Sequence, residues 1–310
     1  MEGFKMDFVT VGPKKYLLTD SYMTVGADIY NMRVRTDDIF VATFPKSGTT
    51  LMQELVWLIE NNLDFEKAES IYLNARFPFL EVTTLIPSSN SQLELSEHIT
   101  DTLAEAVAPL NVKQISELPS PRFIKTHLPL SLLPPTLLDT GKVLYIARDP
   151  RDVAVSFFHH DKLMKSISSD AEFKTYWKYF INGQVFWSPY FSHVLEAWEK
   201  RNNPNLLFLF YEDLLKDLSA GIRKVAKFLN KELTEEQVTA LNEHLQFDNF
   251  KKNKSVNMQV MQEIGFFATD GAFVRKGKKG GWRENFDEEM TAQAEAWIND
   301  NLRDTDFRFP

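Results

Sequence analysis

The sequence contains no cysteine, so it carries neither a disulfide framework nor a cysteine–zinc site. No apolar run approaches the ~20 residues that a membrane helix needs. The first residues, MEGFKMDFVTVGPKKY, lack the apolar region of a secretory signal. Basic residues are in deficit, and the net charge of −8 argues against broad nucleic-acid binding. We therefore expect a cytoplasmic protein without a membrane or nucleic-acid partner.

Apolar residues, by contrast, are abundant. They make up 44% of the 310 residues and include 25 Phe, which is enough for a sizeable core and for an apolar pocket. The chain has no linker rich in Pro, Gly or Ser, no internal repeat and no low-complexity tract. The simplest expectation is a single domain over residues 1–310, in which residues 1–38 form an irregular arm with short strands.

One stretch, residues 39–59, reads as a strand (IFVATF), a tight loop (PKSGTT) and a helix (LMQELVWLI). Such a loop directs backbone N–H groups and a helix N-terminus at one point, which attracts anions. Lys46 adds a positive charge, and the neighbouring hydroxyls add donors. The stretch is not the Walker pattern, because the lysine precedes the glycine. It predicts a phosphate-like guest, although a plain strand–turn–helix with a solvated lysine is the alternative.

The rest of the chain repeats this alternation of strand and helix. Further buried strands are expected at residues 122–125, 142–147 and 206–210, and helices at residues 91–109, 150–160, 172–200, from about 212 to 245, and 288–301. Short apolar strands alternating with helices predict an α/β fold. We expect a central parallel sheet flanked by helices on both faces, with a P-loop-like nucleotide-binding architecture. Ligands in such sheets bind at the carboxyl ends of the strands.

Residues with useful chemistry follow four of the expected strands: residues 46–50, residues 125–127, Arg148 and Tyr211. His127 can accept a proton from a hydroxyl substrate, because the pKa of histidine lies near 7. A structural histidine bonded to a loop is the alternative. Arg148 begins a second candidate anion site, because its planar fork suits phosphate.

Ser156 and the basic run RKGKKGG near the C-terminus are candidates for the same anion site. Two plainer interpretations stay open here: a local charge network at a helix start, and a solvated basic loop. None of the strands ends in the aspartate that would hold Mg²⁺ in a P-loop kinase. We therefore favour metal-independent group transfer over ATP chemistry, and we expect no metal site.

These motifs together resemble those of the cytosolic sulfotransferases. TFPKSGTT is similar to the family's 5′-phosphosulfate loop, FIKTHLP to its catalytic strand and loop, YIARDPRDVAVSFFHH to its 3′-phosphate motif, and RKGKKGGW to its C-terminal loop. The resemblance covers roughly residues 30–290, with four motifs in the family's order and spacing. It implies 3′-phosphoadenosine 5′-phosphosulfate (PAPS) as sulfuryl donor, its product adenosine 3′,5′-bisphosphate (PAP), and a small apolar acceptor with a hydroxyl group.

The resemblance also implies roles for individual residues. His127 is then the general base, Lys46 bridges the sulfuryl group and the leaving phosphate, and Lys125 steadies the transferring group. The implied catalytic residues are His127, Lys46, Lys125 and Ser156. The implied donor-binding residues are Lys46, Ser47, Gly48, Thr49, Thr50, Leu51, Arg148, Ser156, Tyr211, Leu245, Gln246, Phe247, Phe250, Arg275, Lys276 and Gly277.

Three features depart from the family pattern. Leu51 replaces the usual tryptophan that stacks on adenine, and Leu245 and Gln246 replace the usual Thr-Ser before Phe247. The Lys-Thr-Val dimer motif that usually follows the C-terminal tryptophan is absent from RENFDEEMTAQ, so monomer and dimer both stay open.

The segment between RFPFLE and KTHLP is longer than in typical vertebrate members of the family. Its excess length, residues 82–119, resembles the helical lid of insect members of the retinol dehydratase type. A solvent-facing insertion without a catalytic role is the alternative. For the whole chain, the leading hypothesis is a sulfotransferase. Retinol dehydratase-like sulfonation followed by elimination, and a non-catalytic nucleotide-binding module, are the alternatives.

Overall fold

The computed structural model describes residues 7–85 and 108–310, which form a single α/β domain. Its centre is a parallel sheet with the strand order β4-β3-β5-β6. The strands are β3 (Ile39–Thr43), β4 (Phe123–Thr126), β5 (Lys142–Ala147) and β6 (Leu206–Phe210). The register pairs Val41 of β3 with Lys125 on one side and with Leu144 on the other. The predicted fold class and strands are thus confirmed, with shifts of a residue or so at the strand ends.

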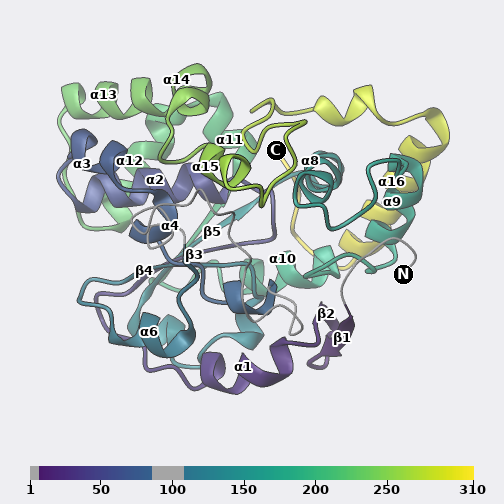
Figure 1. Cartoon of the computed structure of the whole chain (residues 1–310), viewed down its shortest axis with the longest axis horizontal. Helices are drawn as coiled ribbons and strands as arrows, with labels where there is room; N and C mark the ends of the chain where they lie inside the picture. The colour runs from purple at the N-terminus through teal and green to yellow at the C-terminus, as the bar shows by residue number, and fades with distance from the viewer. Residues whose placement is uncertain (1–6, 86–107) are drawn as a thin grey trace.

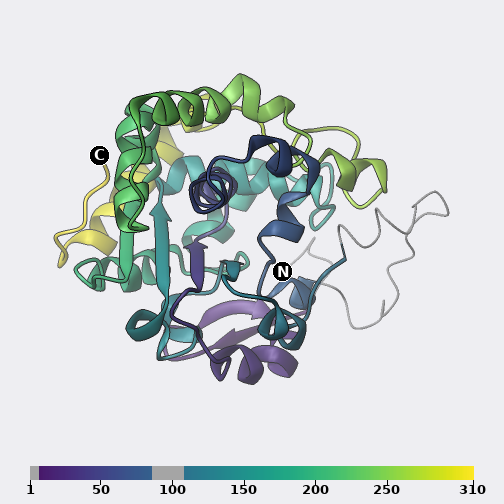
Figure 2. The ribbon, with the colours of Figure 1, turned by 90° about the vertical axis from the view of Figure 1, so that its left-hand side faces the viewer.

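Helices cover both faces of the sheet because each strand is apolar on both sides (Figures 1 and 2). Phe40 and Tyr145 pack on one face, and Val41 and Leu144 on the other. The first face is covered by α8 (Pro150–Leu163), α9 (Phe173–Ile181), α10 (Tyr190–Glu199) and α16 (Glu288–Leu302). The second face is covered by α2 (Thr49–Glu60), α12 (Leu218–Phe228) and α13 (Glu235–Leu245).

Shorter elements complete the described chain. They are β1 (Phe8–Val11), β2 (Tyr16–Thr19), α1 (Tyr22–Tyr30), α3 (Phe65–Ser70), α4 (Leu73–Arg76), η1 (Val82–Leu85), α6 (Val112–Glu117), η2 (Leu130–Leu132), α7 (Leu137–Thr140), α11 (Tyr211–Lys216), α14 (Phe247–Lys252), α15 (Gln259–Glu263) and η3 (Gly281–Glu284). Strands β1 and β2 pair antiparallel to form a small separate sheet.

Two segments differ from the sequence-based expectation, and a third cannot be compared with it. The arm at residues 1–38 has the expected short strands, but it also contains α1, which packs Tyr22 and Ile29 into the core. The helical stretch expected at residues 172–200 is two helices, because α9 gives way to a left-handed turn at Gly183 and Pro189 caps the start of α10. Most of the helix expected at residues 91–109 lies outside the described residues.

Candidate active site

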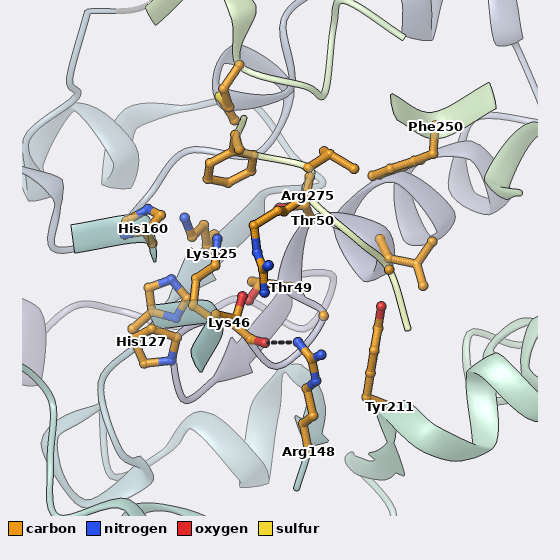
Figure 3. A pocket seen from close by; sticks show the side chains of 18 of the residues that line it. Lys46, Thr49, Thr50, Lys125, His127, Arg148, His160, Tyr211, Phe250 and Arg275 are labelled. Atoms are coloured by element: carbon orange, nitrogen blue, oxygen red, sulfur yellow. Dashed lines mark hydrogen bonds between the residues drawn. The ribbon is translucent and has the colours of Figure 1, made fainter. Parts of the chain in front are cut away.

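A cavity of about 940 Å³ opens at the carboxyl ends of the four parallel strands (Figure 3). Each strand delivers one wall residue to it: His127 follows β4, Lys46 follows β3, Arg148 follows β5 and Tyr211 follows β6. The strand order therefore fixes the order of these residues across the site. The sequence pattern predicted this convergence, and the structure confirms that the four positions share one cavity.

The loop between β3 and α2 has the backbone of an anion cradle. Lys46 and Gly48 both have positive φ angles, of 66° and 113°. A Cβ atom at Gly48 would lie 2.7 Å from the Tyr211 ring, so only glycine fits this approach. Ser47 does not line the cavity; its side chain is fully buried, and its Oγ has no hydrogen-bond partner among residues 7–85 and 108–310. A buried hydroxyl without a partner is rare in folded proteins.

Two lysines lie in the cavity, where burial makes their charged forms less favourable. Burial, with Lys125 and Arg148 nearby, lowers the pKa of Lys46 to about 7. Burial likewise lowers the pKa of Lys125 to about 8. The Lys46 ammonium lies 4.4 Å from the centre of the Phe273 ring, and the Lys125 ammonium lies 4.2 Å from that of Phe79. Both cations thus rest on aromatic faces rather than on carboxylates, which leaves them available to an anionic ligand.

His127 is oriented as a proton acceptor. Its Nδ1 lies 2.9 Å from the backbone oxygen of Thr43, and because a carbonyl oxygen only accepts, Nδ1 carries the proton. The other nitrogen, Nε2, then has a free lone pair, and no partner for it occurs in residues 7–85 or 108–310. Burial, followed by the charge of Lys125, holds the pKa of His127 well below its usual value. The ring is therefore a neutral base at the cavity wall.

Two residues that the sequence analysis missed hold His127 in place. Glu81 accepts the backbone N–H of His127 at 2.6 Å and the hydroxyl of Thr126 at 2.8 Å. His193 donates from Nε2 to the backbone oxygen of His127 at 2.8 Å, and its Nδ1 bonds to the Tyr145 hydroxyl. These contacts join segments far apart in the chain, so no local pattern signals them. They fix the backbone of the base on both sides.

A second group of cationic side chains, from Arg148 and the C-terminal loop, lies at the cavity. Arg148 donates to the backbone oxygens of Lys46 at 2.9 Å and Lys278 at 3.2 Å, while its buried Nε has no partner in the part of the chain that the structure describes. Arg275 lines the same cavity, and burial followed by Arg148 lowers its pKa. The ammonium of Lys276, in contrast, pairs with Glu284. The predicted second cluster thus converges through Arg148 and Arg275, with Lys276 turned to a carboxylate.

Gly277 explains how this loop approaches so closely. Its φ is 56°, and a Cβ there would lie 2.1 Å from the Phe247 ring. The other residues predicted for donor binding also line the cavity. They are Thr49, Thr50, Leu51, Ser156, Tyr211, Leu245, Gln246, Phe247 and Phe250. Every predicted site residue except the buried Ser47 therefore lies on the cavity wall.

The opposite end of the cavity is mainly apolar. Phe79 and Trp187 each lie 5.2 Å from the His127 ring, measured between ring centres. His160 and Asn74 also line the cavity. Further apolar residues that line it include Pro78, Val82, Leu85, Leu110, Met164, Met258, Met261, Ile264, Phe266, Phe267 and Phe273. The count of phenylalanines predicted an apolar pocket but could not say which rings line it.

Comparison with known proteins identifies the family of this chain. The family described as "Sulfotransferase domain" matches residues 36–306. The chain belongs to the sulfotransferase family. It is 35% identical to the luciferin sulfotransferase of Photinus pyralis, over 99% of this chain and 83% of that protein. It is 34% identical to sulfotransferase 1C2 of Oryctolagus cuniculus, over 83% of this chain and 80% of that protein.

Two similar solved structures are both retinol dehydratase, at 48% identity. One, in complex with androsterone and the inactive cofactor PAP, has a TM-score of 0.93 over 99% of this chain and 92% of that chain. The other, in complex with retinol and PAP, has a TM-score of 0.92 over 99% and 93%. This sulfotransferase has no helix, within its described residues, of the length and apolarity needed to cross a membrane. The same residues contain no cluster of three or more potential metal ligands.

Proposed function

We propose that this sulfotransferase moves the sulfuryl group of PAPS to the hydroxyl of a small apolar acceptor, with His127 as general base. The single observation that carries the proposal is the arrangement of His127. Its proton is held on Nδ1 by the Thr43 carbonyl, and its free Nε2 lies in the same cavity as Lys46 and Lys125. Bound PAPS supplies an activated sulfuryl group, and the apolar end of the cavity supplies room for the acceptor.

The donor end is suited to a ligand with phosphates at both ends. The loop from Lys46 to Thr50 offers the N-terminus of α2 to one phosphate, together with the residues Thr49 and Thr50 on the cavity wall. Arg148 and Arg275 offer guanidinium groups to the other. Ser156, from α8, and the backbone at Gly277 complete this second subsite. Tyr211, Phe247 and Phe250 offer rings to the adenine, in place of the tryptophan that Leu51 replaces.

His127, Lys46 and Lys125 each have a separate role in the transfer of the sulfuryl group. His127 takes the acceptor's hydroxyl proton on Nε2 as the oxygen forms its bond to sulfur. Lys46 offsets the charge that grows on the leaving phosphate oxygen, and Lys125 offsets the charge on the sulfuryl oxygens. The products are a sulfate ester and PAP. Held in line, these groups need no reorganisation when the sulfur–oxygen bond to the phosphate breaks.

The test is direct. Purified protein is incubated with ³⁵S-labelled PAPS and a panel of phenols, steroids and retinol, and labelled products are separated. We expect labelled sulfate esters of apolar hydroxyl compounds. Tight PAP binding with no transfer to any member of the panel would favour a non-catalytic nucleotide-binding module and would count against the proposal.

A second candidate function is sulfonation followed by elimination. It is favoured by the two retinol dehydratase structures, which have TM-scores above 0.9 to this chain. In that reaction an allylic sulfate ester loses sulfate, and anhydroretinol accumulates from retinol. Product analysis by chromatography separates the two outcomes, since the leading proposal leaves a stable ester.

We further propose that residues 82–119 act as a lid on the acceptor end. Val82 and Leu85 at its start, and Leu110 towards its end, line the cavity.

We also propose a cytosolic location, which the absence of cysteine supports. We do not expect dimerisation through the usual C-terminal motif, because that motif is absent. Light scattering of the purified protein measures its oligomeric state.

Binding of PAP is expected to take up protons. In the free protein the pKa values of Lys46 and Lys125 are lowered to about 7 and about 8. A bound anion favours the charged lysines, so it raises both pKa values. Affinity is therefore highest below about pH 7 and falls as the pH rises through 7 and 8, where binding must first recharge the lysines. Titration calorimetry in two buffers with different ionisation enthalpies measures the uptake, and equal heats in both buffers would contradict it.

A further inference from the structure

His160 is a second histidine in the cavity, and the functions assigned so far make no use of it. It comes from the last turns of α8 and lines the chamber with His127, Lys46 and Lys125 (Figure 3). Its imidazole is near enough to the two lysines for their charges to act on it, and burial followed by Lys46 holds the pKa of His160 well below its usual value. The ring is therefore neutral.

Neither ring nitrogen of His160 has a hydrogen-bond partner in the described part of the chain. Nδ1 is sealed from solvent, and the nearest carboxylate oxygen, from Asp161, is 4.0 Å away. The Asp161 carboxylate instead accepts a hydrogen bond from Tyr176 at 2.7 Å. Nε2 is not among the sealed atoms, so it is the nitrogen that a ligand in the chamber can reach. An unpaired polar group in such a place is costly unless a ligand or water pairs with it.

The surroundings of His160 decide which group that ligand brings. Phe157 and Phe273 pack against the ring, with centres 6.2 and 5.8 Å away, and Lys46, Ser156 and Arg275 line a small pocket with it. An ammonium group would be repelled by Lys46 and Lys125 beside it. A hydroxyl is neutral and both donates and accepts, so it pairs with Nε2 whichever nitrogen carries the proton. Lys46 marks the transfer point and lines the same two pockets as His160, so a hydroxyl next to the reacting one is within reach of this ring.

We propose that His160 selects acceptors that carry a second hydroxyl adjacent to the reacting hydroxyl, as in ortho-dihydroxyphenyl compounds with an apolar body. This inference rests on the proposed sulfotransferase reaction. His127 takes the proton of one hydroxyl, while Nε2 of His160 hydrogen-bonds the other. A chamber built to bond a hydroxyl discriminates against the analogue that lacks it, because its own polar group is then left unpaired.

The test compares two acceptors, 4-tert-butylphenol and 4-tert-butylcatechol, in the wild-type protein and in His160→Phe. Phenylalanine keeps the planar ring and removes the hydrogen bond. We expect the catechol-to-phenol ratio of kcat/KM to fall roughly 5- to 10-fold in His160→Phe, which is the value of about one hydrogen bond. Comparing ratios cancels the statistical advantage of two hydroxyls. His160→Gln, which retains a donor and an acceptor, should keep most of the preference.

Two controls keep the outcomes separate. PAP affinity should be unchanged in His160→Phe, and turnover of the phenol should be at least that of the wild type. An unchanged ratio in His160→Phe, with both acceptors sulfonated, would overturn the role of His160 and leave the sulfotransferase proposal standing. A lack of transfer to either acceptor or to any other hydroxyl compound in the wild type would overturn the reaction itself.

Discussion

Replacing His127 with alanine is expected to lower kcat by about 10²- to 10⁴-fold, the usual contribution of a general base. Within the described residues, His127 is the only imidazole whose Nδ1 is bonded to the Thr43 carbonyl and whose Nε2 faces the reaction site, and the variant lacks it. Because the His127 side chain is neutral, its loss removes no positive charge from the donor end. PAP affinity should therefore remain close to that of the wild type. Single-turnover rates with labelled donor, together with calorimetric PAP binding, measure both quantities.

His127→Asn provides the matched control for this prediction. Asparagine can still donate to the Thr43 carbonyl, but its amide is not basic, so the rate should fall as far as in His127→Ala. Thermal melting of both variants checks that the contacts of Glu81 and His193 with the backbone of residue 127 survive. Turnover near the wild-type level in either variant would refute the assignment of His127 as the base.

Replacing Lys46 with methionine is expected to lower kcat by about 10²- to 10³-fold, the typical effect of removing one preorganised donor to a developing negative charge. Methionine keeps the length and apolar stem of lysine and can still pack on the Phe273 ring. Unlike the loss of His127, this change removes a cation from the donor end, so PAP binding should weaken as well. The proton uptake on PAP binding should also decrease, because one of the two lysines with lowered pKa values is gone.

Lys224→Met is the matched control for the lysine. Lys224 lies on the exposed side of α12, away from the cavity, and its substitution has the same chemistry. It should leave kcat, PAP affinity and proton uptake unchanged. A Lys46→Met variant that kept its rate and its proton uptake would show that Lys46 is not the cation at the leaving group.

Much of the fold could be predicted from the sequence because buried parallel strands are continuous apolar runs. The run at β5, KVLYIA, has this form, and the loop after β3 combines a lysine with glycine and hydroxyls. Local patterns failed where tertiary contacts decide. Helix α1 contains Gly26 and gives a weak helical signal, yet it forms because Tyr22 and Ile29 are buried in the core. The break before α10 was hidden by the aromatic residues on both sides.

The same limit applies to the site. Residues on strand ends and in the anion loops could be predicted, because topology alone brings strand ends together. Glu81 and His193 could not, since their partner is the backbone of His127 and any acidic or histidine residue in the chain would have been an equal candidate. His160 follows another histidine on α8, and only the packed structure shows that its ring faces the chamber.

The buried carboxylate of Glu81 has a consequence for how this enzyme can diversify. It ties the chain just before the lid segment to the catalytic loop, and Arg122, just after that segment, is tied to Asp38 by a buried ion pair. The described residues on both sides of the segment that we propose as a lid are thus held by buried polar contacts. We therefore expect insertions or replacements between residues 85 and 108 to change the acceptor without moving His127, since loop length itself costs little. Chimaeras that take this segment from related enzymes should retain donor binding while acquiring a new acceptor range.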